Sequence, residues 1–237
     1  MTPRSKQPIV KELKHPGDSA GTRITRDFLN STMIKFANLN SKIYASAGSY
    51  PFEYAERQIQ SVLFCSFVDI GAFPYAEYPI LRKIRGRPKR KGWLDLWVLY
   101  RNTMFLIEFK HTWASFNSTK LPRWINYAWN GAIKDVCAIS KQTLNEERAY
   151  GNVKMFELVM LTIRLEQHPR KGNKPGIVDD IKARQRVMAL YKSLKPRPVW
   201  VFYWCLNEKL QRRPHEWDGQ FWNYPAICLL VWSKEVA

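Results

Sequence analysis

The stretch KGWLDLWVLYRNTMFLIEFKHTW, residues 91 to 113, consists of two apolar runs on either side of a short polar turn at residues 101 to 103. This pattern predicts two paired β-strands, at residues 93–100 and 104–113. These two strands form a hairpin. Whether the hairpin contains a functional site depends on the faces of the sheet to which the charged side chains within the apolar runs point. Those side chains are Asp95, Glu108 and Lys110.

The three charges converge if the strands pair across the turn. Successive side chains of a strand point to opposite faces, so Glu108 and Lys110 point to the same side. A turn centred between Arg101 and Asn102 places Asp95 level with Glu108 on the neighbouring strand. A carboxylate within a run as apolar as FLIEF is costly to bury without a partner. This favours a functional cluster over the alternative, a solvated hairpin face with an exposed Glu–Lys pair.

Two adjacent carboxylates repel each other unless one is protonated, a cation lies between them, or solvent screens them. Hard oxygen ligands suit Mg²⁺, which takes one or two protein carboxylates and otherwise keeps water and phosphate oxygens. A lysine beside such an ion can orient water or help to deprotonate it, and its charge can stabilise a phosphoryl transition state. Asp95, Glu108 and Lys110 therefore predict a metal site for phosphodiester hydrolysis.

Composition predicts one folded domain. With 237 residues and 46% hydrophobic residues the chain can bury a substantial core, and we expect a domain at residues 23–237 after a loose basic tail at 1–22. The longest apolar runs, 199–206 and 226–232, are far shorter than the roughly 20 residues of a membrane-spanning helix, so no membrane partner is expected. With no apolar h-region and four cysteines without CxxC spacing, we expect a cytoplasmic protein with reduced, buried thiols.

Positive charge is the strongest feature of the composition. The chain has 38 Lys and Arg residues against 20 Asp and Glu residues, a formal net charge of +18. Residues 82–91, RKIRGRPKRK, include seven basic residues and no acidic one. Nucleic acid is the expected partner of such a chain, and a generically basic soluble protein is the alternative.

Periodicity elsewhere predicts both helices and strands. Apolar residues at spacings of three and four indicate helices, and short apolar runs bounded by turn residues indicate strands. The predicted helices cover residues 24–44, 52–70, 124–142 and a segment from Asp179 or Asp180 to about Leu194. The other predicted strands are 76–81, 155–165, 199–206 and 226–232, with basic loops at 82–91 and 166–176.

This arrangement resembles the restriction-endonuclease-like superfamily, the PD-(D/E)XK nucleases, whose core runs helix, three-stranded meander, helix, strand. The family's second-strand aspartate matches Asp95, and its E-x-K motif matches Glu108 and Lys110. The first-helix glutamate best matches Glu56, with Glu53 as the competing choice.

The resemblance covers about residues 50–165. It implies an α/β fold with a mixed central sheet flanked by helices. To this core the chain adds an amino-terminal helical extension and, at about residues 177–237, a helix with two strands.

The resemblance also implies a Mg²⁺-dependent nuclease, with Mn²⁺ able to substitute, that hydrolyses DNA and leaves a 5′-phosphate and a 3′-hydroxyl. Asp95 and Glu108 would hold the metal, and Lys110 would position or activate water. Glu56 would hold a second metal or a water on it.

Two departures from the family pattern bear on the mode of cleavage. Leu94 stands where the family name has proline, which many members also lack. Gln142 is followed four residues later by Glu146 and not by the tyrosine of the exonuclease-type Q-x-x-x-Y motif, which favours an endonuclease.

Cleavage of both DNA strands with one site per chain implies a homodimer.

The basic stretch RGRPKR, residues 85–90, resembles an AT-hook core, in which an extended Arg-Gly-Arg-Pro lies in the minor groove of A·T-rich DNA. The alternative is a basic hairpin tip that contacts phosphates without reading sequence. On the following helix, two lysines lie where the family often places phosphate-contacting or supporting residues. The residues expected to bind nucleic acid are Arg82, Lys83, Arg85, Arg87, Lys89, Arg90, Lys91, Lys134 and Lys141.

Two other functions are compatible with the sequence. The first is a non-catalytic nucleic-acid-binding subunit of a larger defence or recombination complex, which would bind without cleaving. The second is an RNA-directed nuclease with the same residues. Clustered carboxylates count against the binding subunit because they repel phosphate. His111 would point away from the face of Lys110, which predicts a packing role.

Overall fold

In the computed structural model, five helices flank a seven-stranded sheet. The described residues are 8–17, 20–84, 87–118, 120–149, 153–167, 176–207, 211–214 and 221–236. The helices are α1 (Ala20–Ala47), α2 (Glu56–Asp69), α3 (Arg123–Cys137), α4 (Lys141–Ala149) and α5 (Asp180–Ser193), with a 3₁₀ turn η1 (Pro51–Glu53). The strands are β1 (Val10–Lys14), β2 (Phe73–Ile84), β3 (Arg87–Tyr100), β4 (Thr103–Ser115), β5 (Lys154–Glu166), β6 (Trp200–Cys205), β7 (Arg212–Pro214), β8 (Phe221–Asn223) and β9 (Ala226–Glu235).

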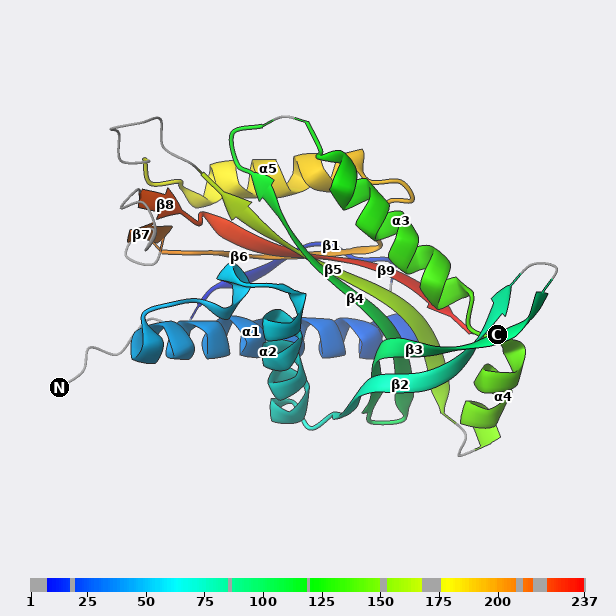
Figure 1. Cartoon of the computed structure of the whole chain (residues 1–237). Coiled ribbons are helices and arrows are strands. Elements are labelled where there is room, and N and C mark those ends of the chain that lie inside the picture. Colours follow the sequence, from blue (N-terminus) through cyan, green and yellow to red (C-terminus); the bar gives the residue numbers. More distant parts are fainter. Residues whose placement is uncertain are drawn as a thin grey trace.

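The sheet is mixed and runs through the middle of the molecule (Figure 1). Its strand order is β1-β6-β9-β5-β4-β3-β2. β4 and β5 are parallel, with Thr103 opposite Lys154 and Ser115 opposite Glu166, and the other neighbours are antiparallel. Parallel strands need a long crossover, and here the connection contains α3 and α4.

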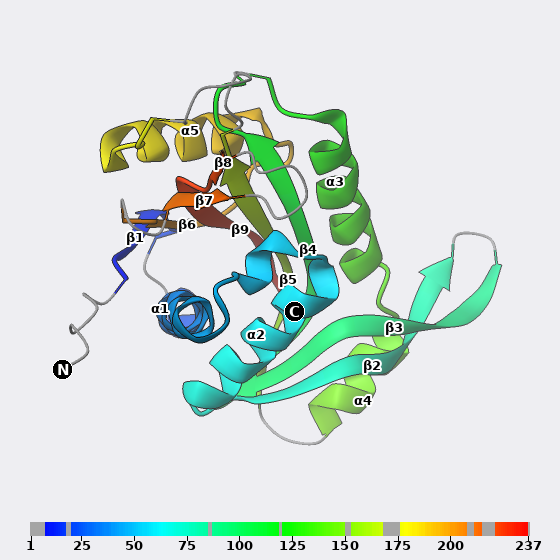
Figure 2. The same cartoon turned by 60° about the vertical axis from the view of Figure 1, so that its left-hand side comes forward.

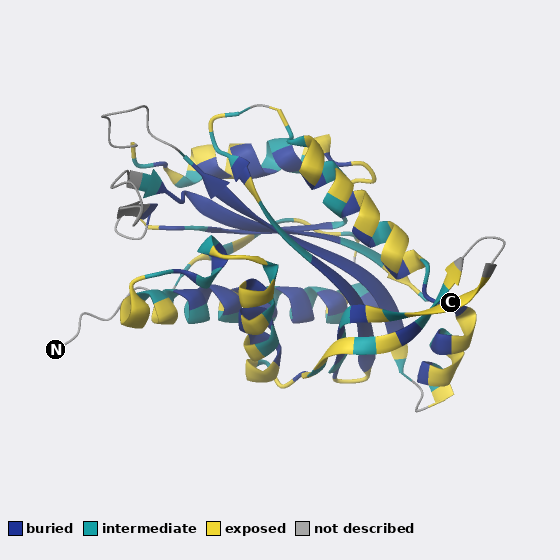
Figure 3. Ribbon diagram, viewed as in Figure 1, coloured by how far each residue is buried: buried dark blue, intermediate teal, exposed yellow. Residues whose placement is uncertain are grey.

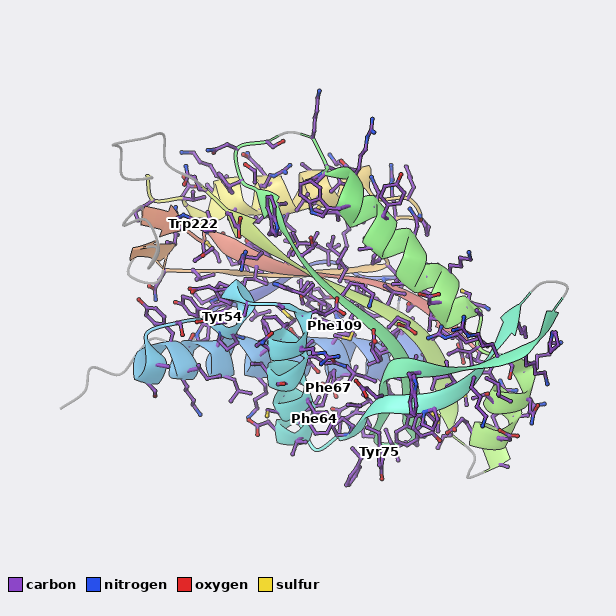
Figure 4. The ribbon with its side chains drawn as sticks, viewed as in Figure 1. Tyr54, Phe64, Phe67, Tyr75, Phe109 and Trp222 are labelled. Carbon is purple, nitrogen blue, oxygen red and sulfur yellow. The ribbon has the colours of Figure 1, made fainter. Side chains whose placement is uncertain are left out.

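Helices cover both faces of the sheet because its central strands carry apolar side chains on both faces. α1 and α2 lie on one face, where Phe28 stacks on Phe105 at a centroid distance of 4.3 Å and where Phe67 and Phe109 are buried (Figure 4). α3 and α5 lie on the opposite face (Figures 1 and 2), around the buried Trp129. No helix within the described ranges is long and apolar enough to cross a bilayer.

The predicted meander of three strands is present. β3 and β4 pair with Tyr100 opposite Thr103 and Leu96 opposite Ile107, which is the predicted register. Arg101, in the turn, has a φ of 54°, the left-handed conformation that such a tight turn requires. The order α2, β2, β3, β4, α3, β5 places one helix before the meander and one after it.

Two expectations for the first part of the chain were wrong. The tail expected to be loose contains β1, which adds to the sheet as an edge strand by pairing with β6. The helix expected at 52–70 is interrupted, because η1 ends at an extended Tyr54 and α2 begins only at Glu56. The extended backbone of Tyr54 and Ala55 separates η1 from α2, and the apolar periodicity does not reveal this break.

Two further boundaries differ from expectation. The basic segment expected as a loop at 82–91 consists largely of paired strand, with Arg82 opposite Arg90. The helix expected at 124–142 ends at Cys137, and a separate helix, α4, starts at Lys141. Ser140 precedes α4 and caps its first turn, because Ser140 Oγ accepts a hydrogen bond from Thr143 N. Residues 168–175 of the second predicted basic loop lie outside the described residues.

Candidate active site

The candidate site lies where β3 and β4 separate. Their pairing ends at Leu96 and Ile107, so Asp95 and Glu108 are the first residues beyond it. β4 remains paired with β5 on its other side, with Glu108 opposite Val159. The N–H groups of β4 that would have bonded to β3 therefore need other acceptors.

Two carboxylates accept hydrogen bonds from this separated edge of β4. Asp95 Oδ2 accepts from Phe109 N at 2.8 Å, and Glu56 Oε2 accepts from His111 N at 3.1 Å. The two N–H groups are two residues apart because alternate residues of a strand bond to the same neighbour. Glu56 lies in the first turn of α2, where the helix dipole favours negative charge. The backbone of β4 thus holds both carboxylates in place.

Lys110 lies between these two carboxylates. Its Nζ is 3.3 Å from Glu56 Oε1 and 3.3 Å from Asp95 Oδ2. Burial lowers the pKa of Lys110, but the negative charges of Asp95 and Glu56 together outweigh burial, and the pKa is raised. Lys110 is therefore a protonated hydrogen-bond donor at neutral pH and not a free base.

Glu108, which is only 4% exposed, completes the cluster of Glu56, Asp95, Glu108 and Lys110 from its buried side. Burial, reinforced by the charge of Asp95 and a hydrogen bond between the two side chains, raises the pKa of Glu108 to about 7, although Arg82 acts to lower it. Arg82 Nη2 donates to Glu108 Oε1 and, at 2.7 Å, to Trp93 O, while its Nη1 donates to Asp135 O. The ionised form of Glu108 is thus disfavoured by burial and by Asp95, and a cation beside its carboxylate stabilises that form.

Two contacts that support the cluster were not predicted from the sequence. The first is that of Arg82 with Glu108, since Arg82 was expected among the nucleic-acid-binding residues. Gly92 makes room for the Arg82 side chain, because a Cβ at Gly92 would lie 2.9 Å from Arg82 Nε. Gln60 Nε2 donates to Asp95 O at 3.1 Å. The spacing of Gln60 four residues after Glu56 could have identified it, because such residues share a helix face. The pairing of Arg82 with Glu108 leaves no signal in the sequence.

β2 is irregular beside the cluster. Glu77 has a φ of 52° and lies between the pairs Ala76–Leu96 and Tyr78–Leu94, level with Asp95. A non-glycine residue in the left-handed region costs about 1–3 kcal/mol and often marks a functional site. Asp95 therefore lies at a local distortion of the sheet on both of its sides.

Of the other predicted residues, two lysines lie apart from the cluster. Lys134 is exposed on α3 and Lys141 is exposed at the start of α4, and neither contacts a cluster carboxylate in the described interactions. Glu53, the alternative to Glu56, belongs to η1. The exposed basic residues of the β2–β3 hairpin are Lys83, Lys89, Arg90 and Lys91, Arg87 begins β3, and Arg85 lies outside the described residues.

His111 has the packing environment expected of it. Its Nδ1 is 2.8 Å from Thr162 Oγ1 and its Nε2 is 3.2 Å from Phe52 O. Burial, reinforced by the charge of Arg164, lowers the pKa of His111 to about 4. The imidazole is therefore neutral at physiological pH and joins β4 to β5 and η1.

The donor chemistry of the cluster fits a hard divalent cation. Asp95 and Glu108 are adjacent carboxylates, and Mg²⁺ needs only one or two of these. Among the described residues, no group of three or more His, Cys, Asp or Glu side chains is arranged so that it could hold a metal ion by itself. In this structure Arg82 and Lys110 supply the positive charge that the carboxylates require.

Comparison with known proteins places the chain in no family. No family model, no curated protein and no solved structure matches it.

Proposed function

We propose that the protein is a metal-dependent nuclease that hydrolyses phosphodiester bonds within DNA. The observation that carries the proposal is the ammonium of Lys110 between Glu56 and Asp95, at the point where β3 and β4 separate. The order of α2, the β2–β4 meander, α3 and β5 supports it, because the PD-(D/E)XK nuclease core has the same order. The net charge of +18 suits a nucleic-acid substrate.

The residues of the cluster have separate roles in this proposal. Asp95 and Glu108 hold Mg²⁺ or Mn²⁺, which when bound supplies charge that neutralises a phosphoryl oxygen and lowers the pKa of water. Lys110, which stays protonated, directs its three N–H groups to Glu56 Oε1, Asp95 Oδ2 and Phe109 O, and its positive charge stabilises the negative charge that develops on the phosphate. Glu56 orients the Lys110 ammonium through its Oε1.

Plasmid cleavage tests the proposal directly. Purified protein is incubated with supercoiled plasmid in Mg²⁺, Mn²⁺ or EDTA, and we expect nicking or cutting only with a divalent ion. Asp95→Asn, Glu108→Gln and Lys110→Met should each lower the cleavage rate by at least about 10²-fold, because each removes a group that acts on the reacting atoms.

The matched control is Asp69→Asn, which changes an exposed carboxylate at the end of α2. This variant should cleave at the wild-type rate. DNA binding in EDTA should persist in all four variants because none removes a basic side chain of the hairpin. Metal-dependent cleavage at the wild-type rate by Asp95→Asn would refute the proposal.

One observation favours the second candidate, a non-catalytic nucleic-acid-binding subunit. Asp95, Glu56 and Glu108 each already have a cationic or N–H partner, so a structural role for the three carboxylates is chemically complete. This candidate predicts salt-sensitive binding in EDTA and no cleavage of plasmid, linear duplex or single strands with any divalent ion. Cleavage of RNA alone would instead identify an RNA-directed nuclease.

A further inference from the structure

Three large aromatic side chains are exposed where β4 ends and α3 begins. Trp113 is 42% exposed, Trp124 is 47% exposed and Tyr127 is 77% exposed. The rings of Trp113 and Trp124 lie together, with centroids 5.0 Å apart and an interplanar angle of 50°. These three side chains do not belong to the hydrophobic core, whereas Trp129 of the same helix α3 is buried completely. Large apolar side chains exposed side by side mark an interaction surface.

These aromatic side chains lie close to the proposed active site along the chain. Trp113 follows Lys110 by three residues on β4, which corresponds to about 10 Å at the rise of a strand, or about three stacked bases of a nucleic-acid strand. Figure 2 shows the end of β4 next to the start of α3. Because this spacing of three is odd, Lys110 and Trp113 belong to opposite faces of β4, so a nucleic-acid strand held at Lys110 would reach the two tryptophans by crossing the edge of β4 beyond its pairing with β3.

Positive charge accompanies the aromatic side chains along α3. The face of α3 turned away from the sheet is exposed (Figure 3) and includes Arg123 and Lys134, and Lys120 is exposed just before the helix. The exposed acid of this face, Asp135, lies at the end of α3 where its carbonyl accepts from Arg82. Beyond it the backbone of Lys83 donates to Ala138 O, which joins α3 to the basic β2–β3 hairpin. Cations thus occur at both ends of the aromatic surface.

We propose that Trp113, Trp124 and Tyr127 form a stacking surface for the unpaired bases of single-stranded DNA. The inference rests on the proposed nuclease function and deepens it, because it names a substrate with a single-stranded region beside the cleaved bond. A duplex hides its base faces inside the stack, so exposed indole rings gain little from it, whereas unpaired bases stack on aromatic side chains at any sequence. Arg123 and Lys134 then contact the phosphates of the same strand.

Binding measured in EDTA tests this surface separately from catalysis. Fluorescence anisotropy is recorded with a labelled oligothymidine of about 20 nucleotides and with a duplex of the same length. The double variant Trp113→Ala/Trp124→Ala should bind the single strand about 5- to 150-fold more weakly, the range for loss of stacking of one base at about 1–3 kcal/mol. Its affinity for the duplex should change less than about twofold, since duplex binding depends on phosphates.

The matched control is Tyr75→Ala, which removes an aromatic side chain that is 60% exposed on β2. Figure 4 places Tyr75 on the opposite side of the molecule from α3. This variant should bind both DNAs as the wild type does. The variant Trp113→Phe/Trp124→Phe keeps aromatic faces and should recover most of the affinity, which separates stacking from a folding defect.

Equal weakening on single strand and duplex, or no weakening on either, would overturn the stacking surface. Selective weakening on single-stranded RNA but not on oligothymidine would also overturn it, because DNA is then not the partner. No divalent ion is present, so inactive catalysis cannot imitate any of these results. Conversely, a protein that never cleaves but shows the expected selective loss would retain this surface and lose only the nuclease proposal.

Discussion

Asp95 interacts with Lys110, Glu108 and Gln60 of the candidate site. Its Oδ2 accepts from Phe109 N and lies 3.3 Å from Lys110 Nζ, and its charge contributes to the raised pKa of Glu108. Its own carbonyl accepts from Gln60 on α2. One aspartate at the end of the β3–β4 pairing thus links an ammonium, a second carboxylate and α2, while Glu56 and Arg82 complete the contacts of Lys110 and Glu108.

The choice between Glu56 and Glu53 yields a prediction at this scale. Glu56→Gln removes the charge beside Lys110 Nζ and weakens its orientation, so the cleavage rate should fall by about 10- to 100-fold, as for groups that orient catalytic residues. Glu53→Gln is the isosteric control and should leave the rate unchanged, because Glu56 is the glutamate whose Oε1 lies 3.3 Å from Lys110 Nζ. Initial rates of plasmid nicking in Mg²⁺ measure both. A larger loss in Glu53→Gln would reverse the assignment.

The β2–β3 hairpin is the element that extends beyond the sheet (Figure 2). α4 supports its base, where Tyr78 OH donates to Glu147 Oε1 at 2.6 Å and Trp97 Nε1 donates to Glu147 Oε2 at 2.9 Å. Farther out, Lys89 Nζ donates to Gln142 Oε1 at 2.8 Å. Pairing of Arg82 with Arg90 keeps this part of the hairpin in strand conformation, which favours phosphate contacts by a basic hairpin over an AT-hook.

The hairpin should control the salt dependence of DNA binding. Replacing its four described exposed cations with alanine should reduce the slope of log K against log[salt] by about 3 to 4, since each phosphate that a cation neutralises adds about 0.9 to that slope. Duplex binding is measured in EDTA across a salt series. The substituted residues are Lys83, Lys89, Arg90 and Lys91.

The control for the hairpin removes the same number and type of cations from the region of α5. The exposed residues changed to alanine are Lys182, Arg184, Lys192 and Lys195. Net charge falls equally in both proteins, so a local contact and a general electrostatic effect can be told apart. An equal change of slope in the two variants would contradict a binding role for the hairpin.

The whole molecule is organised around a sheet buried on both faces, and one thiol, that of Cys228, is buried in this sheet. All four cysteines are free; Cys228 is buried on β9, whereas Cys65 and Cys137 are exposed. Cys205 is half-buried, and the expectation of buried thiols was therefore wrong for Cys65 and Cys137. Burial raises the pKa of Cys228 to about 12, because no solvent reaches a thiolate there.

The buried thiol predicts a loss of stability in alkaline solution. Below about pH 8.5, Cys228 is protonated in both the folded and the unfolded chain and has no effect. Above that pH the unfolded chain releases the proton and the folded chain retains it, so the free energy of unfolding falls by about 1.4 kcal/mol per pH unit. Urea unfolding at about pH 8, 9 and 10 should show a steeper loss for wild type than for Cys228→Ala. Cys65→Ala, an exposed thiol, should keep the wild-type slope.

The local pattern of apolar and polar residues predicted most helices and strands but not where each of them begins and ends. The meander register followed from two apolar runs around Arg101, and the start of α5 followed from its cap, since Asp179 Oδ1 accepts from Lys182 N. β1 and the hairpin strands beyond Leu81 could not be predicted in this way. Most of their residues are polar or charged, and they are strands because a neighbouring strand satisfies their backbone groups.

The sequence by itself determined the α/β class, the meander and the approach of Asp95 to Glu108, because a period of two and a short turn are local properties of the chain. Only the tertiary structure decided that β3 and β4 separate at those residues, that Glu56 meets Lys110, and that Arg82 reaches Glu108. The reason is physical. Each of these contacts joins elements far apart in the chain, and their partners are selected by the packing of helices and strands around unsatisfied N–H groups and charges.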